Sequence, residues 1–363
     1  MSIATAIQNA QQKVAAAYTA VSSKGGTLPQ TQDLSNLPTA INSISVGGSK
    51  FGASIDSFLG NVDSSGTLYP ANTDTYLSFD GVKKMKDYAL FHKFYYDADI
   101  DGVTFPDLEE LRNSSNMGNF ALTNAFSQCT NLTYARFPKL KHIQALYAFN
   151  GIFSGCTNLT EINFDNLEYA AESDCFKAAF SSCTNLQSAS FPKLTYLVGW
   201  ERAFSQCSNL TSVSFPVLAT MSGSSCCESM FSQCSNLTSI SFPELVTAGS
   251  GNYGNSIFRF AFSSCTSLQT MTFPKLASMI GQNTFQYAFS SCTSLTSISF
   301  PALNSNSFGN NYTNQFNSML NGVTGCTVHF PSNLESVIGS WTDVTAGFGG
   351  TNTTVLFDLP ATE

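Results

Sequence analysis

Charged residues are scarce in this sequence. They make up only 11% of the 363 residues, whereas globular proteins average roughly 25%. Acidic residues outnumber basic ones, which gives a formal net charge of −8. A surface with few basic side chains and a net negative charge repels phosphate backbones, so we expect no nucleic-acid partner.

Long apolar runs are also missing. No stretch reaches the ~18 apolar residues that a membrane-spanning helix requires, so we expect no membrane insertion. The first residues, MSIATAIQNAQQKVAAAYTAV, lack the basic start of a secretory signal peptide, and Gln8, Gln11 and Lys13 interrupt its apolar stretch. We therefore expect no simple Sec-dependent export.

Residues that usually carry catalysis are few and scattered. The three histidines form no metal-binding pair four residues apart: His92, His142 and His329. No glycine-rich phosphate loop or nucleophile elbow occurs. The acidic run DADID at 97–101 has Gly102 at the sixth position of a calcium loop, but Leu108 replaces the glutamate required at the twelfth, which favours a solvated turn. A glycan hydrolase would need a carboxylate pair that we cannot place. We expect no cofactor, no metal site and no enzymatic activity.

What the sequence does contain is a repeat. The segment AFSQCTNLTYARFPKL at 125–140 returns in similar form at 179–194 and 288–303. Each copy has one cysteine, a leucine three residues later, a phenylalanine eight residues later and another phenylalanine three residues earlier. Successive cysteines are 24 to 31 residues apart, at Cys129, Cys156, Cys183, Cys207, Cys234, Cys265 and Cys292.

This period, with leucine and phenylalanine at fixed offsets, predicts a solenoid of leucine-rich type, because one coil cannot bury its apolar residues alone. We expect an α/β repeat solenoid, right-handed, with one short parallel strand per coil from the LTxxxFP motif. In that motif Leu295, Ile298 and Phe300 point inward. An aromatic residue four positions before the first phenylalanine of most copies, such as Phe149 before Phe153, predicts a short helical turn.

The fixed cysteine allows three interpretations. A row of buried, reduced thiols is favoured, because small, moderately apolar cysteine suits a tight bend and the copies lack the close pairs of zinc sites. Some disulfides, or a metal site, are the alternatives. The three cysteines in the variable segments, Cys175, Cys226 and Cys227, are expected to be exposed and oxidisable.

The repeated AFSxCTNLTxxxFPxL motif, from about Phe91 to Leu303, resembles the BspA-like leucine-rich repeat family. The resemblance implies a leucine-rich repeat fold. For function, it implies bacterial surface proteins and their relatives, which bind other proteins or host surfaces. The secreted members of the family carry a signal peptide, which this sequence does not show.

We divide the chain into five segments. Residues 1–45 are an N-terminal helical docking or oligomerisation segment, 46–50 a linker, and 51–90 a small β cap. The repeat solenoid covers 91–303 and begins with a degenerate copy in which Asp97 stands at the cysteine position. Residues 304–363 form a C-terminal cap with two or three strands, since solenoids need capping coils.

The first 45 residues contain a heptad pattern of apolar residues, at Ile3, Ile7, Ala10, Val14, Ala17 and Val21. We interpret it as a seam for self-association, with a trimer favoured, or for docking. A helical hairpin folded onto the array is the alternative. Residues 3–44 also loosely resemble N-terminal segments of virion structural proteins from phages of Gram-positive gut bacteria, which implies other virion proteins as partners.

Two surfaces are candidates for binding. The outward strand positions of the later copies hold serine or threonine, for example Ser212 and Ser214, which suit the surface of a sheet or contact with glycan. The variable segments hold aromatic and charged residues that differ between copies, as binding loops on a fixed scaffold do. From them we select as ligand-binding Tyr147, Trp200, Arg202, Tyr253, Arg259 and Tyr287. Trp200 lies four residues before Phe204, so its expected role is to support its neighbours.

These observations predict a non-enzymatic phage virion protein, a tail or appendage component located in the virion. Its array would recognise a host cell-surface protein or glycan. A bacterial BspA-like adhesin on the cell surface is the first alternative. A purely structural virion or scaffold protein is the second.

Overall fold

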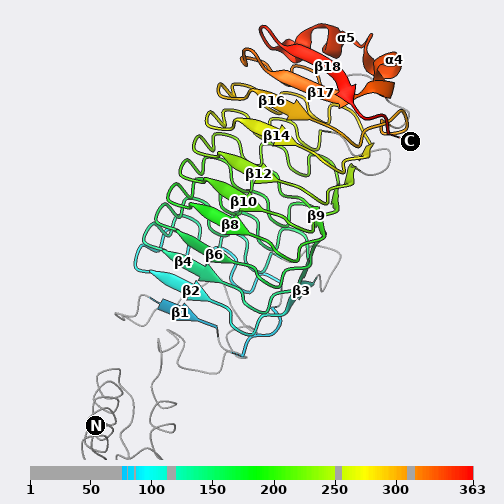
Figure 1. Cartoon of the computed structure of the whole chain (residues 1–363). Helices are drawn as coiled ribbons and strands as arrows, with labels where there is room; N and C mark the ends of the chain where they lie inside the picture. Colours follow the sequence, from blue (N-terminus) through cyan, green and yellow to red (C-terminus); the bar gives the residue numbers. More distant parts are fainter. Residues whose placement is uncertain are drawn as a thin grey trace, which may run out of the picture.

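The computed structural model describes residues 76–362 apart from 80, 86, 113–119, 250–255 and 309–314. The described part is a solenoid whose coils stack along one axis, from β1 (Tyr76–Ser78) to the short helices α4 (Glu335–Ile338) and α5 (Thr342–Thr345) (Figure 1). The predicted segments 1–45 and 46–50, and most of 51–90, lie outside the described residues. No helix in the described part is long and apolar enough to cross a membrane.

The first side of each coil is the short strand predicted from the LTxxxFP motif, and together these strands form row A. Its members are β1, β2 (Gly102–Thr104), β4 (Tyr134–Arg136), β6 (Glu161–Asn163), β8 (Ser188–Ser190), β10 (Ser212–Ser214), β12 (Ser239–Ser241), β14 (Thr270–Thr272), β16 (Ser297–Ser299), β17 (Thr327–Pro331) and β18 (Thr354–Leu359). All pairs are parallel; Ser212, for example, lies between Ser188 and Ser239. Row A consists of three hydrogen-bonded groups that are in contact where β6 meets β8 and β12 meets β14.

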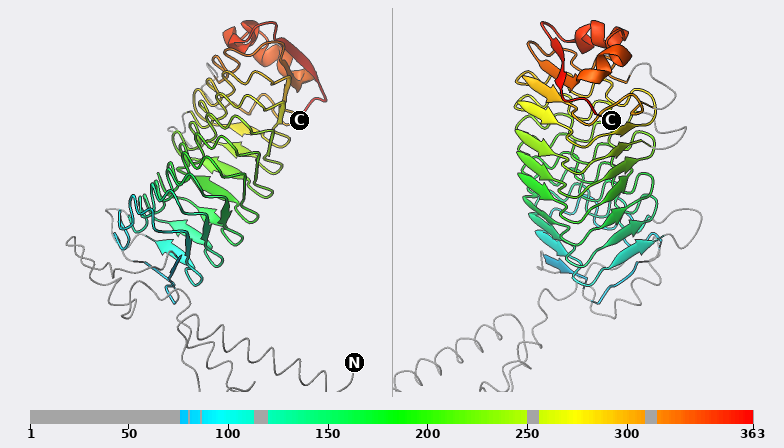
Figure 2. Two further views of the ribbon diagram at one scale, coloured as in Figure 1. Left: turned by 90° about the vertical axis from the view of Figure 1, so that its left-hand side faces the viewer. Right: turned by 45° about the vertical axis from the view of Figure 1, so that its right-hand side comes forward.

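A second strand in most coils forms row B, which the prediction of one strand per coil missed. Its members are β3 (Glu110–Arg112), β5 (His142–Gln144), β7 (Tyr169–Ala170), β9 (Tyr196–Val198), β11 (Thr220–Ser222), β13 (Thr247–Ala248) and β15 (Ser278–Met279). The right-hand view of Figure 2 shows the two rows on different sides of the solenoid. Row B strands have only two or three residues, too few for alternation along the sequence to identify them.

The third side consists of turn segments, at 87–96, 121–128, 146–155, 173–182, 201–206, 224–233, 257–264, 284–291 and 315–322. They are not helical, which corrects the predicted helical turn. Every fourth residue has a positive φ, such as Ala178 at 51° and Ser182 at 61°. N–H groups donate alternately to the next coil and back within the coil: Phe153 donates to Ala179 over 2.9 Å, and Ser154 to Gly151 over 3.0 Å.

The core lies between the three sides and is built from columns of stacked side chains. Phe215 lies between Phe191 and Phe242, with ring centroids 5.2 and 5.5 Å apart. In a second column, Phe204 stacks on Phe180 at 5.1 Å. The repeated leucines and phenylalanines are all buried. Each buried phenylalanine contributes roughly 1.5–3 kcal/mol, so the columns hold the coils together.

All eleven cysteines are buried free thiols, as the thiol-row interpretation predicts for the seven of the repeat. The expectation that Cys175, Cys226 and Cys227 are exposed was wrong, because pairs of adjacent residues in the variable segments face the core, such as Cys226 with Cys227. Cys175 donates to the carbonyl of Val198 over 3.2 Å. The sulfur of Cys227 lies 3.8 Å from that of Cys226.

The degenerate first copy is a full coil in backbone terms. Asp97 N–H donates to the Phe94 carbonyl over 3.0 Å, as Cys129 N–H donates to that of Phe126 over 3.2 Å. At the other end, β17 and β18 extend row A into the segment 304–363. Short helices follow β17, at η2 (Ser332–Leu334), α4, α5 and η3 (Gly347–Gly349), and precede β18.

Candidate binding surface

The turn segments follow one rule in each coil for which side chains face the core. In the coil of Cys156, the residues three, four and seven positions before the cysteine are buried: Phe153, Ile152 and Phe149. The residues two, six and nine positions before it are partly exposed: Ser154, Asn150 and Tyr147. The backbone hydrogen bonds between coils keep this register along the array, so outward side chains form columns. We call this side the turn face.

Row A presents a more uniform surface. From β8 to β16 its outward residues are all serine or threonine. Adjacent coils are linked on this side by contacts such as that between the hydroxyls of Ser299 and Thr272, 2.8 Å apart. Charge appears on β4 and β6, where Arg136 donates to both carboxylate oxygens of Glu161 over 3.1 and 3.2 Å.

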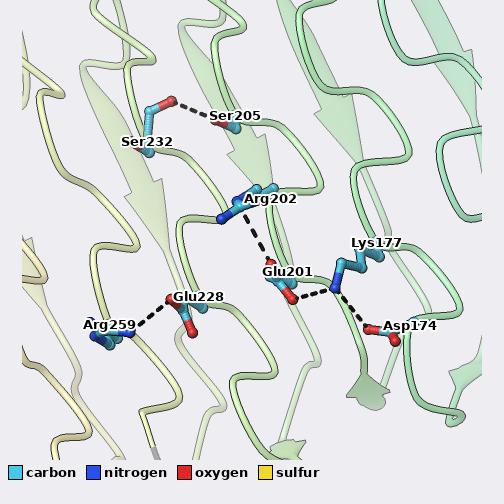
Figure 3. A network of polar contacts seen from close by, with 8 residues as sticks. All are labelled: Asp174, Lys177, Glu201, Arg202, Ser205, Glu228, Ser232 and Arg259. Carbon is cyan, nitrogen blue, oxygen red and sulfur yellow. Dashed lines mark hydrogen bonds and ion pairs between the residues drawn. The ribbon is translucent and has the colours of Figure 1, made fainter.

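The turn face carries a group of six charged residues, which we call the charged cluster: Asp174, Lys177, Glu201, Arg202, Glu228 and Arg259 (Figure 3). Lys177 Nζ lies 2.8 Å from Glu201 and 3.7 Å from Asp174. The guanidinium of Arg202 lies 3.7 Å from the other oxygen of Glu201. Lys177 and Glu201 each stand six positions before the cysteine of their own coil, so the repeat itself brings this pair together.

The second half of the charged cluster joins an aromatic pair. Arg259 lies 3.1 Å from Glu228 and stacks over the ring of Phe260 at 5.0 Å. Phe260 in turn stacks on Tyr287 of the next coil, with centroids 4.9 Å apart. Guanidinium and aromatic groups on a rigid support are the side chains that dominate most binding interfaces.

Within the charged cluster, the ion pair with Glu201 favours the charged form of Lys177. Burial alone would lower the pKa of Lys177, but the hydrogen bond and charge of Glu201 raise it above its ordinary value. The three acidic and three basic residues balance one another. Exposed ion pairs of this kind contribute only ~0–1 kcal/mol each, so a partner can replace them at little cost.

The structure places four of the six selected residues on the turn face. Arg202, Arg259 and Tyr287 lie there as described, and Tyr147 stacks on Phe120 with centroids 4.8 Å apart. Trp200 is fully buried and stacks on Phe176 at 4.3 Å, so it supports its neighbours, as its spacing from Phe204 indicated. Tyr253 and the six residues of the N-terminal seam lie outside the described residues.

Sequence reasoning missed a second group on the turn face, in the first coil. Tyr88, Phe91, His92, Tyr95 and Tyr96 stand nine, six, five, two and one positions before Asp97. These are the outward positions of the turn segments. Extending the alignment of Asp97 with the cysteines to the residues before it would have identified them. The hydrogen bond with Tyr96 raises the pKa of the Tyr95 hydroxyl.

The described residues offer no site that resembles a catalytic or metal centre. Among them, no group of three or more histidine, cysteine, aspartate or glutamate side chains is placed to hold a metal ion. In the DADID run, Asp97 accepts a hydrogen bond from the N–H of Asp99 over 3.0 Å, which makes a local turn. Burial raises the pKa of Cys207 and Cys292 to about 12, so these thiols are poor nucleophiles.

Comparison with solved structures finds bacterial leucine-rich repeat proteins. One from Bacteroides ovatus is 17% identical, with a TM-score of 0.32 and coverage of 75% of this chain and 87% of that chain. A leucine rich cell surface protein from Faecalibacterium prausnitzii is also 17% identical, with a TM-score of 0.34 and coverage of 78% and 88%. Comparison with curated proteins gives no match.

The family model for the BspA type leucine rich repeat region matches at residues 100–178, 122–251, 177–286 and 251–338. These matches overlap into one stretch that contains the seven copies of the cysteine motif, all of row B and row A from β2 to β17. The stretch covers well over half of the 363 residues. The chain therefore belongs to the BspA type leucine-rich repeat family.

Proposed function

We propose that this chain is a non-enzymatic attachment protein that acts at a bacterial surface and binds its partner through the turn face. One observation carries the proposal. The inward positions of the turn segments stay apolar, with phenylalanine three positions before every repeat cysteine, whereas the outward positions five and six before the cysteine change from coil to coil: Lys177, Glu201 and Arg202, then Glu228, Arg259 and Phe260. A constant core under a varied, aromatic and charged face is how binding scaffolds are built.

The family supports the same proposal, because BspA-like repeats imply surface proteins that bind other proteins or host surfaces. The surface of row A is less suited to binding a partner than the turn face. Its small hydroxyls give a partner little area to bury, and large rigid side chains supply most of the energy of an interface.

The test compares two variants of the full chain for attachment to intact bacterial cells and to epithelial cell layers. In the turn-face variant, Arg202→Ser, Arg259→Gln and Tyr287→Ser each introduce the residue that the next coil has at that position: Ser229, Gln286 and Ser318. In the row A variant, Ser212→Lys and Ser241→Lys alter a partly exposed and an exposed residue, which do not pair with each other.

We expect the turn-face variant to lose attachment at least 10-fold and the row A variant to keep it. Loss in the row A variant alone would place the partner on the strands. If the wild-type protein attaches to neither cell type, the proposal is wrong.

A phage appendage is a second candidate, favoured by the heptad seam of Ile3 to Val21 and by its resemblance to virion proteins. In this setting residues 1–45 dock to a virion partner or form a trimer, and the array faces the host. Deleting 1–45 should leave a folded array and abolish the oligomer or the docking. Light scattering would measure the mass, and an unchanged mass together with unchanged virion incorporation would exclude this candidate.

A further inference from the structure

The first described coil differs from all later coils on the turn face. At the two positions before the cysteine, later coils hold small or amide side chains, such as Ser127 and Gln128. The first coil holds Tyr95 and Tyr96 there, next to Asp97. Together with Tyr88, Phe91 and His92 they form what we call the aromatic strip.

The rings of the aromatic strip touch one another in an unbroken run. Neighbouring ring centroids, from Tyr88 through Phe91, His92 and Tyr95 to Tyr96, are 5.6, 4.3, 5.4 and 4.4 Å apart. The neighbours meet edge to face rather than in parallel stacks. Tyr96 is 65% exposed and Tyr88 51% exposed.

Packing does not require these rings. The core beneath them is made by the inward residues of the same segment, Ala89, Leu90 and Phe94, which are buried. Tyr96 has a φ of 63°, which Gln128 shares in the next coil, so the backbone accepts an amide residue at this position. Large exposed aromatic patches on soluble proteins usually mark a binding site.

Polar groups that suit hydroxyl ligands lie close to the aromatic strip in space or in the sequence. The amide nitrogen of Asn124 lies 3.3 Å from Nε2 of His92. Asp99 and Asp101, three and five residues after Tyr96, are exposed. A pyranose with equatorial hydroxyls has apolar C–H groups on its faces and hydroxyls around its edge. Aromatic faces pack against the C–H groups of the sugar. Carboxylates accept hydrogen bonds from its hydroxyls, and amides both donate to them and accept from them.

Size favours a sugar chain over a protein partner. Phe120 and Tyr147 continue the stack from Tyr88 over two more coils, with centroids 4.9 and 4.8 Å apart. At ~4.8 Å per coil, three coils extend ~14 Å along the axis. A specific protein partner covers ~800 Å², a footprint about 28 Å across.

We propose that the aromatic strip binds β-linked, equatorially substituted oligosaccharides by stacking sugar rings on Tyr88, Phe91 and Tyr96, with Asp99 and Asp101 holding their hydroxyls. This inference rests on the proposed function and names its ligand class. The charged cluster, several coils away along the array, is a separate contact region.

The experiment titrates the full chain with cellohexaose and with chitohexaose by isothermal calorimetry. The strip variant, Tyr95→Ser with Tyr96→Gln, installs the residues of the second coil, so its fold should persist, as a thermal melt will verify. We expect wild-type protein to bind at least one of the two sugars and the strip variant to bind it at least 10-fold more weakly. The turn-face variant of Arg202, Arg259 and Tyr287 should bind it like wild type.

The outcomes separate this inference from the proposed function. The inference is wrong if wild-type protein binds neither hexasaccharide, or if the strip variant binds as well as wild type. The proposed function would still be tested by cell attachment of the turn-face variant. Loss of cell attachment in the strip variant without any hexasaccharide binding would indicate a protein partner and also overturn it. If wild-type protein binds a hexasaccharide but does not attach to cells, the proposed function is wrong and the sugar-binding inference stands.

Discussion

The thiol of Cys183 donates a hydrogen bond to the carbonyl oxygen of Phe153, in the preceding coil, over 3.1 Å. The same oxygen accepts the N–H of Cys156 over 3.0 Å. All seven repeat cysteines make this contact, with sulfur–oxygen distances of 3.0 to 3.1 Å. Cysteine recurs because its side chain fits a buried bend and also links one coil to the next.

Replacing a repeat cysteine should therefore cost more than replacing a cysteine without this link. Cys183→Ala removes the donor to Phe153, whereas the sulfur of the equally buried Cys326 lies 3.7 Å from the carbonyl of its own neighbour Thr327. We expect Cys183→Ala to lower the free energy of unfolding by about 1 kcal/mol more than Cys326→Ala does. Urea unfolding measures both, and equal losses would show that the thiol bond is unimportant.

Native thiols should resist alkylation even at alkaline pH. Burial raises the pKa of Cys207 to about 12, so at pH 9 the folded chain holds almost no reactive thiolate at this site. Iodoacetamide should leave all eleven buried cysteines unlabelled in the native chain and label all of them after denaturation without reductant, as counted by mass spectrometry. Native labelling of Cys175 would restore the exposed interpretation. Two missing labels after denaturation would reveal a disulfide.

The ion pair between Lys177 and Glu201 should give a pH-dependent contribution to stability. Because the folded-state pKa of Lys177 is raised, the contribution is complete below the ordinary lysine pKa of about 10.4 and is lost as the pH rises through the raised value. Lys177 is 34% exposed, which limits the effect to ~0–1 kcal/mol. Glu201→Gln should lower the melting temperature at pH 8 and should match wild type once Lys177 is deprotonated. A constant difference at all pH values would contradict this assignment.

Gly199 should tolerate no side chain. It closes the shortest coil, has a φ of 72°, and an added Cβ would lie 2.2 Å from the backbone nitrogen of Asp174. Gly223 also has a positive φ, but its Cβ would meet only a side-chain atom of Val198. The left-handed conformation costs either alanine ~1–2 kcal/mol. We expect Gly199→Ala to lose clearly more stability than Gly223→Ala in urea unfolding, and a similar loss would mean that the coil relaxes around the clash.

The sequence alone determined the solenoid, row A and the burial of the repeated leucines and phenylalanines. The reason is physical: four apolar positions held in register over seven copies, such as Phe215 and Leu210, can be buried only by stacking the copies. The alternation around Val213 then leaves one strand conformation for the LTxxxFP motif.

Only the tertiary structure decided the rest. A spacing of four places Trp200 and Phe204 on one face in a helix and equally in the turn segments, so the spacing could not distinguish the two backbones. Hydrogen bonds to the next coil decide which of the two backbone conformations forms; for example, the N–H of Phe204 donates to the carbonyl of Met230 over 2.9 Å. The stack that continues the aromatic strip is likewise a tertiary result, because Tyr88 contacts Phe120, and Phe120 contacts Tyr147, only once the coils are stacked.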